Sequence, residues 1–147
     1  MKKKILLAIG AIIIVIQFFQ IDKTRPEVES SKDFITMELP PQKIQDLLHV
    51  ACYDCHSYET KYPWYTNIAP FSWWIKHHIN DGRNHLNFAI WGDYELKKAN
   101  HKLEECYEML ESAEMPMDSY TWLHPEALLT PAERTDLIAY FKEKAGK

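Results

Sequence analysis

The 147-residue sequence is poor in cysteine and has no excess of positive charge. Its three cysteines are too few, and odd in number, for a fold held together by disulfides. After residue 21 the chain carries 14 basic and 21 acidic residues. This acidic balance argues against nucleic-acid binding, which needs a basic face. The chain also lacks internal repeats and low-complexity segments. With 46% hydrophobic residues, we expect one globular domain of ordinary size.

Apolar residues are concentrated near the N-terminus, where Ile5 to Ile21 follow three lysines. A charged start followed by an apolar run is typical of an export signal. The run ends in bulky residues without the small-residue pattern of a cleavage site, so we favour retention over cleavage. We therefore expect 1–21 to be a signal anchor and transmembrane helix in the cytoplasmic membrane. The lysines would lie in the cytoplasm and the rest of the chain on the periplasmic or extracytoplasmic side.

The remaining chain divides into a tether and a helical domain. Residues 22–41 mix charges, serines and prolines, which predicts a tether with little structure. Residues 42–147 form the predicted domain, because apolar residues recur there at helical spacing. The expected fold class is all-α. Four helices are expected, at about 42 to Cys52, near Pro70 to near Gly82, 94–113, and from Pro131 onward with Thr130 and Glu133 as a capping box.

One motif carries chemistry, Cys52-Tyr53-Asp54-Cys55-His56. C-x-x-C-H is the pattern of covalent haem attachment. Thiols three positions apart lie on one side of a helical turn and can add to the two vinyl groups at one edge of the porphyrin. The next residue, His56, then points its imidazole at the iron as the proximal ligand. We therefore predict one covalently bound haem c, held by Cys52, Cys55 and His56.

Two other interpretations of C-x-x-C fit less well. A thioredoxin-type dithiol belongs to a pattern of alternating strands and helices, which is missing here. A zinc site needs a second pair of ligands. The adjacent His77 and His78 diverge by about 100° on a helix, so they make a poor chelating pair. The histidine after the second cysteine, together with the export signal, favours haem.

The sixth ligand of the iron is predicted to be Met115. It precedes Pro116 between two helices, and the proline keeps the thioether from retreating into a helix. Met117 is a rival thioether, although we expect it to face away. His78 and His124 are the imidazole rivals. The competing interpretation of either methionine is that it fills a gap in the core.

The third thiol and the aromatic residues have structural interpretations. Cys106 falls on the apolar stripe of its helix and is expected to be a core residue rather than a regulatory thiol. The large apolar face of a haem needs cover, which aromatic side chains can supply. Candidates for this cover are Trp64, Trp73, Trp74 and Trp91, with ordinary core packing as the competing interpretation for each.

The sequence from about Gln42 to Tyr140 resembles a family of bacterial haem-binding-domain proteins, which are cytochrome c-like and carry a single haem. The resemblance implies a cytochrome c-like helical fold, with Cys52 and Cys55 as attachment points and His56 as proximal ligand. The family's usual Met-Pro-Pro is Met115-Pro116-Met117 here, which puts a second thioether beside the first. The matching stretches are Cys52-Tyr53-Asp54-Cys55-His56-Ser57, Tyr62-Pro63-Trp64-Tyr65, Gly82 to Phe88 with Trp91, and Met115-Pro116 followed by Tyr120, His124-Pro125 and Leu129-Thr130.

These observations favour a membrane-anchored electron carrier rather than an enzyme. His56 and Met115 would hold the iron, and the acidic domain would meet basic surfaces of redox protein partners. The main alternative is a haem enzyme or gas sensor with an open or weakly held sixth position. A haem-free interaction domain with a structural metal is the third hypothesis.

Overall fold

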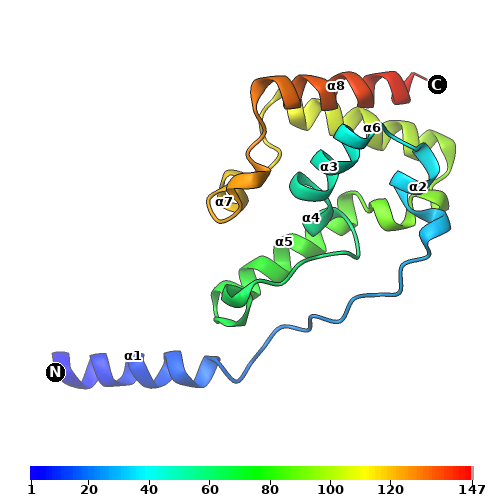
Figure 1. Cartoon of the computed structure of the whole chain (residues 1–147). Helices are drawn as coiled ribbons and strands as arrows, with labels where there is room; N and C mark the ends of the chain where they lie inside the picture. The colour runs from blue at the N-terminus through cyan, green and yellow to red at the C-terminus, as the bar shows by residue number, and fades with distance from the viewer. Residues whose placement is uncertain (147) are drawn as a thin grey trace.

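The computed structural model describes residues 1–146 and contains only helices and loops in that range (Figure 1). This confirms the predicted all-α class. Short 3₁₀ helices, labelled η, alternate with the α-helices. In chain order the elements are α1 (Lys2–Ile16), η1 (Ser30–Lys32), α2 (Phe34–Glu38), α3 (Gln42–Ala51), α4 (Tyr53–His56), η2 (Trp64–Asn67), α5 (Phe71–His85), η3 (Phe88–Asp93), α6 (Leu96–Glu111), α7 (Asp118–Thr121), η4 (Pro125–Ala127) and α8 (Pro131–Ala145).

Two long helices, α6 and α8, lie side by side and form one wall of the domain (Figure 1). Their apolar stripes face the core, where Leu103 and Leu110 of α6 and Leu137 and Phe141 of α8 are buried. The capping box predicted at Thr130 is present at the start of α8. Burial of these stripes against each other stabilises the pair, because each large apolar side chain contributes roughly 1.5–3 kcal/mol when removed from water.

The C-x-x-C-H motif follows directly from α3, as predicted. Three residues of α3, Ile44, Leu47 and Leu48, are buried. The helix ends at Cys52, whose φ of −127° departs from helical geometry. The chain turns there into α4, a helix of four residues that carries the rest of the motif. Packing of α3 against the core therefore sets the direction in which the motif leaves the helix.

Helix α5 begins after Pro70, as predicted, but continues to His85, three residues beyond the predicted end near Gly82. Gly82 is an interior residue of the helix whose absent side chain leaves room for the motif. A Cβ atom at this position would lie 3.1 Å from the carbonyl oxygen of Cys55. The glycine thus permits close approach of two elements and does not end the helix.

The predicted tether over 22–41 does not hold for its second half, since residues 30–32 and 34–38 are helical. Asp33 caps α2 by accepting a hydrogen bond from the amide of Ile35. Phe34 is fully buried, with its ring 4.9 Å from that of Trp91. The core therefore begins at about residue 33, because one buried aromatic side chain ties this segment to the domain.

The N-terminal apolar run forms α1, which is 15 residues long and buries none of them. At 1.5 Å per residue it extends about 22 Å, compared with about 30 Å for the hydrocarbon core of a bilayer. In residues 1–146, no helix is both long enough and apolar enough to cross a membrane. The transmembrane helix predicted over 1–21 is therefore not found.

Candidate haem-binding site

A cavity of about 500 Å³ lies between the motif, α5, α6 and the loop at 112–117, which we call the methionine loop. It brings together the predicted ligands and two of their rivals, Met117 and His78, from segments that are far apart in the chain. Its volume falls within the range of roughly 300–1,000 Å³ found for ligand and cofactor pockets. The predicted site residues among its lining are Cys52, Cys55, His56, His78, Met115 and Met117.

The ring of His56 is held in one orientation by two backbone carbonyl groups at the C-terminal end of α5, one inside the helix and one just after it. Its Nδ1–H donates to the carbonyl oxygens of Gly82 and Leu86, at 3.0 and 3.1 Å. With the proton on Nδ1, the lone pair of Nε2 is available for a metal, and this arrangement is usual for a metal-binding histidine. Desolvation lowers the pKa of His56 below its ordinary value, so the imidazole is neutral at pH 7, as a ligand must be.

Gly82 also contributes to the position of His56. A Cβ at residue 82 would lie 3.4 Å from Cε1 of His56 and 3.4 Å from the Cβ of Cys55. The backbone of α5 therefore supports the second cysteine and the histidine at the same point. The motif places these residues close together in sequence, and α5 fixes their orientation.

Cys52 and Cys55 are half-buried free thiols at the wall of the cavity. Burial raises the pKa of Cys52 to about 12. Burial also raises the pKa of Cys55 to about 11. Both are therefore neutral thiols at pH 7. A neutral thiol has the proton needed for addition of S–H across a vinyl group, and the chemistry of the donor set fits a covalently held haem.

Met115 reaches the cavity on a loop that is hydrogen-bonded to both α6 and α8. Its amide donates to the carbonyl oxygen of Met109 at 3.2 Å. Its own carbonyl oxygen accepts a hydrogen bond of 2.7 Å from Nη1 of Arg134, which also donates to the carbonyl of Leu110 at 2.9 Å. Arg134 therefore joins the methionine loop to α8, and sequence analysis did not identify it, since it lies 19 residues from Met115.

Met117 and His78 also line the cavity, and so does Cys106. The expectation that Met117 faces away is wrong. Nδ1 of His78 lies 2.9 Å from the carbonyl oxygen of Trp74, which is the same type of contact that orients His56. Burial raises the pKa of Cys106 above its ordinary value. Cys106 packs against the core as predicted, but it also forms part of the cavity wall.

The remaining rival ligand and the tryptophans predicted to cover the haem do not line the large cavity. His124 lies outside the large cavity, and its Nε2 is hydrogen-bonded to the hydroxyl group of Tyr65 at 2.5 Å. Among the described residues that line the large cavity there is no tryptophan. Trp91 is buried in the core, whereas Trp64 is 75% exposed. The tryptophan cover predicted for the haem is therefore absent from the large cavity, although Trp74 lines a smaller pocket beside it. The apolar walls of the large cavity come from aliphatic residues, methionines, Phe88 and Phe141.

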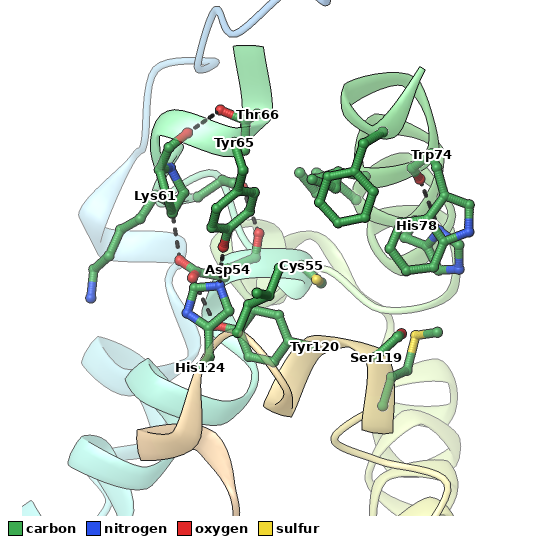
Figure 2. A pocket seen from close by; sticks show the side chains of 17 residues that line it. Asp54, Cys55, Lys61, Tyr65, Thr66, Trp74, His78, Ser119, Tyr120 and His124 are labelled. Carbon is green, nitrogen blue, oxygen red and sulfur yellow. Dashed lines mark hydrogen bonds between the residues drawn. The ribbon is translucent and has the colours of Figure 1, made fainter. Parts of the chain in front are cut away.

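A second, smaller pocket of about 70 Å³ adjoins the first and shares Cys55, His78, Met117 and Tyr120 with it. Figure 2 shows the polar network at its edge, in which Asp54 of the motif accepts hydrogen bonds from the hydroxyl of Tyr120 at 2.8 Å and the amide of Lys61 at 3.0 Å. Desolvation, followed by the charge of Asp54, raises the pKa of Tyr120. This network holds the motif to α7. Sequence spacing contained no signal for it.

The residues also bear on the hypothesis of a structural metal site. In residues 1–146, no group of three or more His, Cys, Asp or Glu side chains is arranged to hold a metal ion. The hypothesis therefore has no ligand set in the described part of the chain.

A helical fold that surrounds an apolar cavity with two thiols and an oriented imidazole defines a protein of the haem-binding class. Comparison with family models agrees, since the model described as haem-binding domain matches residues 11–143. The chain belongs to this haem-binding domain family. Searches of curated proteins and of solved structures gave no match.

Proposed function

We propose that the protein is an exported monohaem cytochrome of the c type, with a cytochrome c-like fold, that carries electrons. The observation that supports this most is the cavity, which collects Cys52, Cys55, His56 and Met115 around an apolar space. When bound, the haem would supply an iron that alternates between the ferrous and ferric states. The residues of the chain provide attachment, orientation and an apolar surrounding.

The two thiols would each form a thioether. The sulfur bonds to one vinyl carbon, the thiol proton goes to the other, and no external oxidant or reductant is needed. His56 would offer Nε2 to the iron, because its Nδ1 proton is committed to backbone carbonyls. Cys52 and Cys55 would then keep the group attached to the domain.

Met115 is the proposed sixth ligand, since its loop is tied to both α6 and α8. A thioether ligand favours the ferrous state and raises the reduction potential, which suits an electron carrier. The acidic domain would meet basic surfaces of redox partners. The three lysines and α1 support export, with the apolar helix held at the membrane and the domain on the extracytoplasmic side.

The test is a set of absorption spectra of the purified protein, oxidised and reduced, with and without CO. A pyridine haemochrome band of the c type should be present, and Cys52→Ala/Cys55→Ala should lose it. Met115→Ala should lose the weak far-red charge-transfer band of methionine ligation, whereas Met117→Ala serves as the matched control and should keep it. Absence of covalent haem in the wild-type protein would refute the proposal.

A haem enzyme or gas sensor is the second candidate, and one observation favours it. The small pocket shares four lining residues with the large cavity, so a small ligand would have space beside the haem. Rapid CO binding to the reduced wild-type protein would support this candidate over the carrier, because an iron with two firm axial ligands resists CO.

A further inference from the structure

Five large apolar side chains are exposed together around η2 and the first turn of α5. Their exposed fractions range from 38% for Phe71 to 75% for Trp64. The rings of Phe71 and Trp74 stack with centroids 5.6 Å apart. Contiguous exposed aromatic surface marks a site of interaction with another molecule or a membrane. We call this set the aromatic patch, and it consists of Trp64, Ile68, Phe71, Trp73 and Trp74.

The C-terminal end of α1 is bound to the same place. The side-chain amide of Gln17 donates to the carbonyl oxygen of Ala69 at 2.9 Å and accepts from the amide of Ala69 at 3.0 Å. Nε1 of Trp73 donates to the carbonyl oxygen of Phe19 at 2.7 Å. Figure 1 shows the end of α1 close to the loop that precedes α5. The apolar helix therefore leaves the domain from the aromatic patch itself.

Basic residues accompany the patch. Nζ of Lys23 donates to the side-chain oxygen of Asn67, at the end of η2. Lys76 follows the patch on α5 and lies close enough to Asp22 for electrostatic attraction. Tryptophans and lysines beside an apolar segment are the composition found where proteins meet lipid headgroups.

We propose that the aromatic patch docks on the headgroup region of a bilayer that contains anionic lipids. This inference rests on the proposed location of α1 at the membrane, and it adds that the folded domain itself lies on the lipid surface. Helix α1, which buries none of its residues, and the patch would enter the same leaflet, because Gln17 and Trp73 hold them together. Docking requires insertion only into the interfacial region of the bilayer, where a Trp side chain contacts both apolar and polar groups of the lipid.

Docking also gives the site an orientation. Phe71 and Trp74 of the patch line the small pocket, which shares Cys55 and His78 with the large cavity. The side of the cavity that includes Cys55 would therefore lie toward the bilayer. A redox partner of the docked domain would be reached at the membrane surface.

The experiment uses the full-length, reduced, haem-loaded protein labelled with 5-fluorotryptophan, in nanodiscs of phosphatidylcholine and phosphatidylglycerol. A nitroxide on the lipid headgroups broadens the ¹⁹F signals of nearby tryptophans, and Trp→Phe variants assign them. We expect the signals of Trp64 and Trp74 to broaden roughly five-fold more than that of the buried Trp91. Discs of phosphatidylcholine alone should reduce this difference, and an unchanged difference would refute the role given to the lysines.

Variants separate docking of the domain from attachment by α1. In Trp64→Ser/Phe71→Ser, the broadening of Trp74 should fall to the level of Trp91 while the chain stays on the disc. Leu96→Ser, which removes a 72% exposed apolar side chain outside the patch, is the control and should keep the broadening. If Trp64 and Trp74 stay sharp in wild-type protein on the disc, docking is refuted and the proposed location stands. If the chain does not associate with discs, both fail.

Discussion

Substitution of Gly82 by alanine tests how the haem-attachment motif is supported. Two opposing effects act at this position. In the interior of a helix, alanine is more favourable than glycine by about 1 kcal/mol. The new Cβ, however, would lie 3.1 Å from the carbonyl oxygen of Cys55. That atom is backbone and has no rotamer to change, so the motif must move by a few tenths of an ångström.

Overpacking of this kind costs about 1–3 kcal/mol. We therefore expect Gly82→Ala to lower the free energy of unfolding by about 1 kcal/mol net, or roughly 3–5 °C in Tm. Because the contact is with the motif, the fraction of chains with covalent haem should fall as well. Thermal unfolding followed by circular dichroism gives the first quantity, and the ratio of haem to protein absorbance gives the second.

The matched control is Asn80→Ala on the same helix. Asn80 is exposed, and alanine there gains helix propensity without a new contact, so Tm should rise slightly. The reasoning would be refuted if Gly82→Ala behaved like this control, with a higher Tm and full haem attachment. Such a result would mean that α5 and the motif do not pack as closely as the structure indicates.

Three other changes test the contacts around the site. Arg134→Gln should lower the free energy of unfolding by about 1.5–3 kcal/mol, because it removes a charged donor from two carbonyls of the methionine-loop region. Denaturant unfolding measures this change, and a variant as stable as the wild type would contradict the role given to Arg134. Tyr53→Phe should lower the free energy of unfolding by about 1–3 kcal/mol, because Asp33 loses the hydroxyl that donates a hydrogen bond to it. Desolvation raises the pKa of Tyr53, so wild-type protein should lose stability as pH rises above about 10, where only the unfolded tyrosine ionises. A pH series of Tm values should show a smaller alkaline loss in the variant, and an unchanged loss would argue against this group. Thr130→Ala should lower unfolding free energy by about 1 kcal/mol through loss of the capping box with Glu133, and Thr130→Ser should restore most of it.

Several features followed from the sequence because they depend on residues that are close together along the chain. The buried stripe of α3 and the capping box of α8 are patterns within a few residues, and both are found. The end of α5 was misplaced because glycine is a common terminator, whereas Gly82 serves a contact with a distant segment. The tether was extended too far because composition does not reveal that Phe34 is fully buried.

The chemistry of the haem-attachment motif could be predicted from the sequence alone. Two thiols and an imidazole within five residues predict which group the motif holds, because residues this close along the chain stay close in space in a helical turn. Tertiary structure decided which groups oppose them. Met115, Met117 and His78 share one cavity with the motif, and Arg134 fastens the methionine loop. These partners lie tens of residues from the motif, and only burial of apolar helix faces, α6 on α8 and the motif on α5, brings them together.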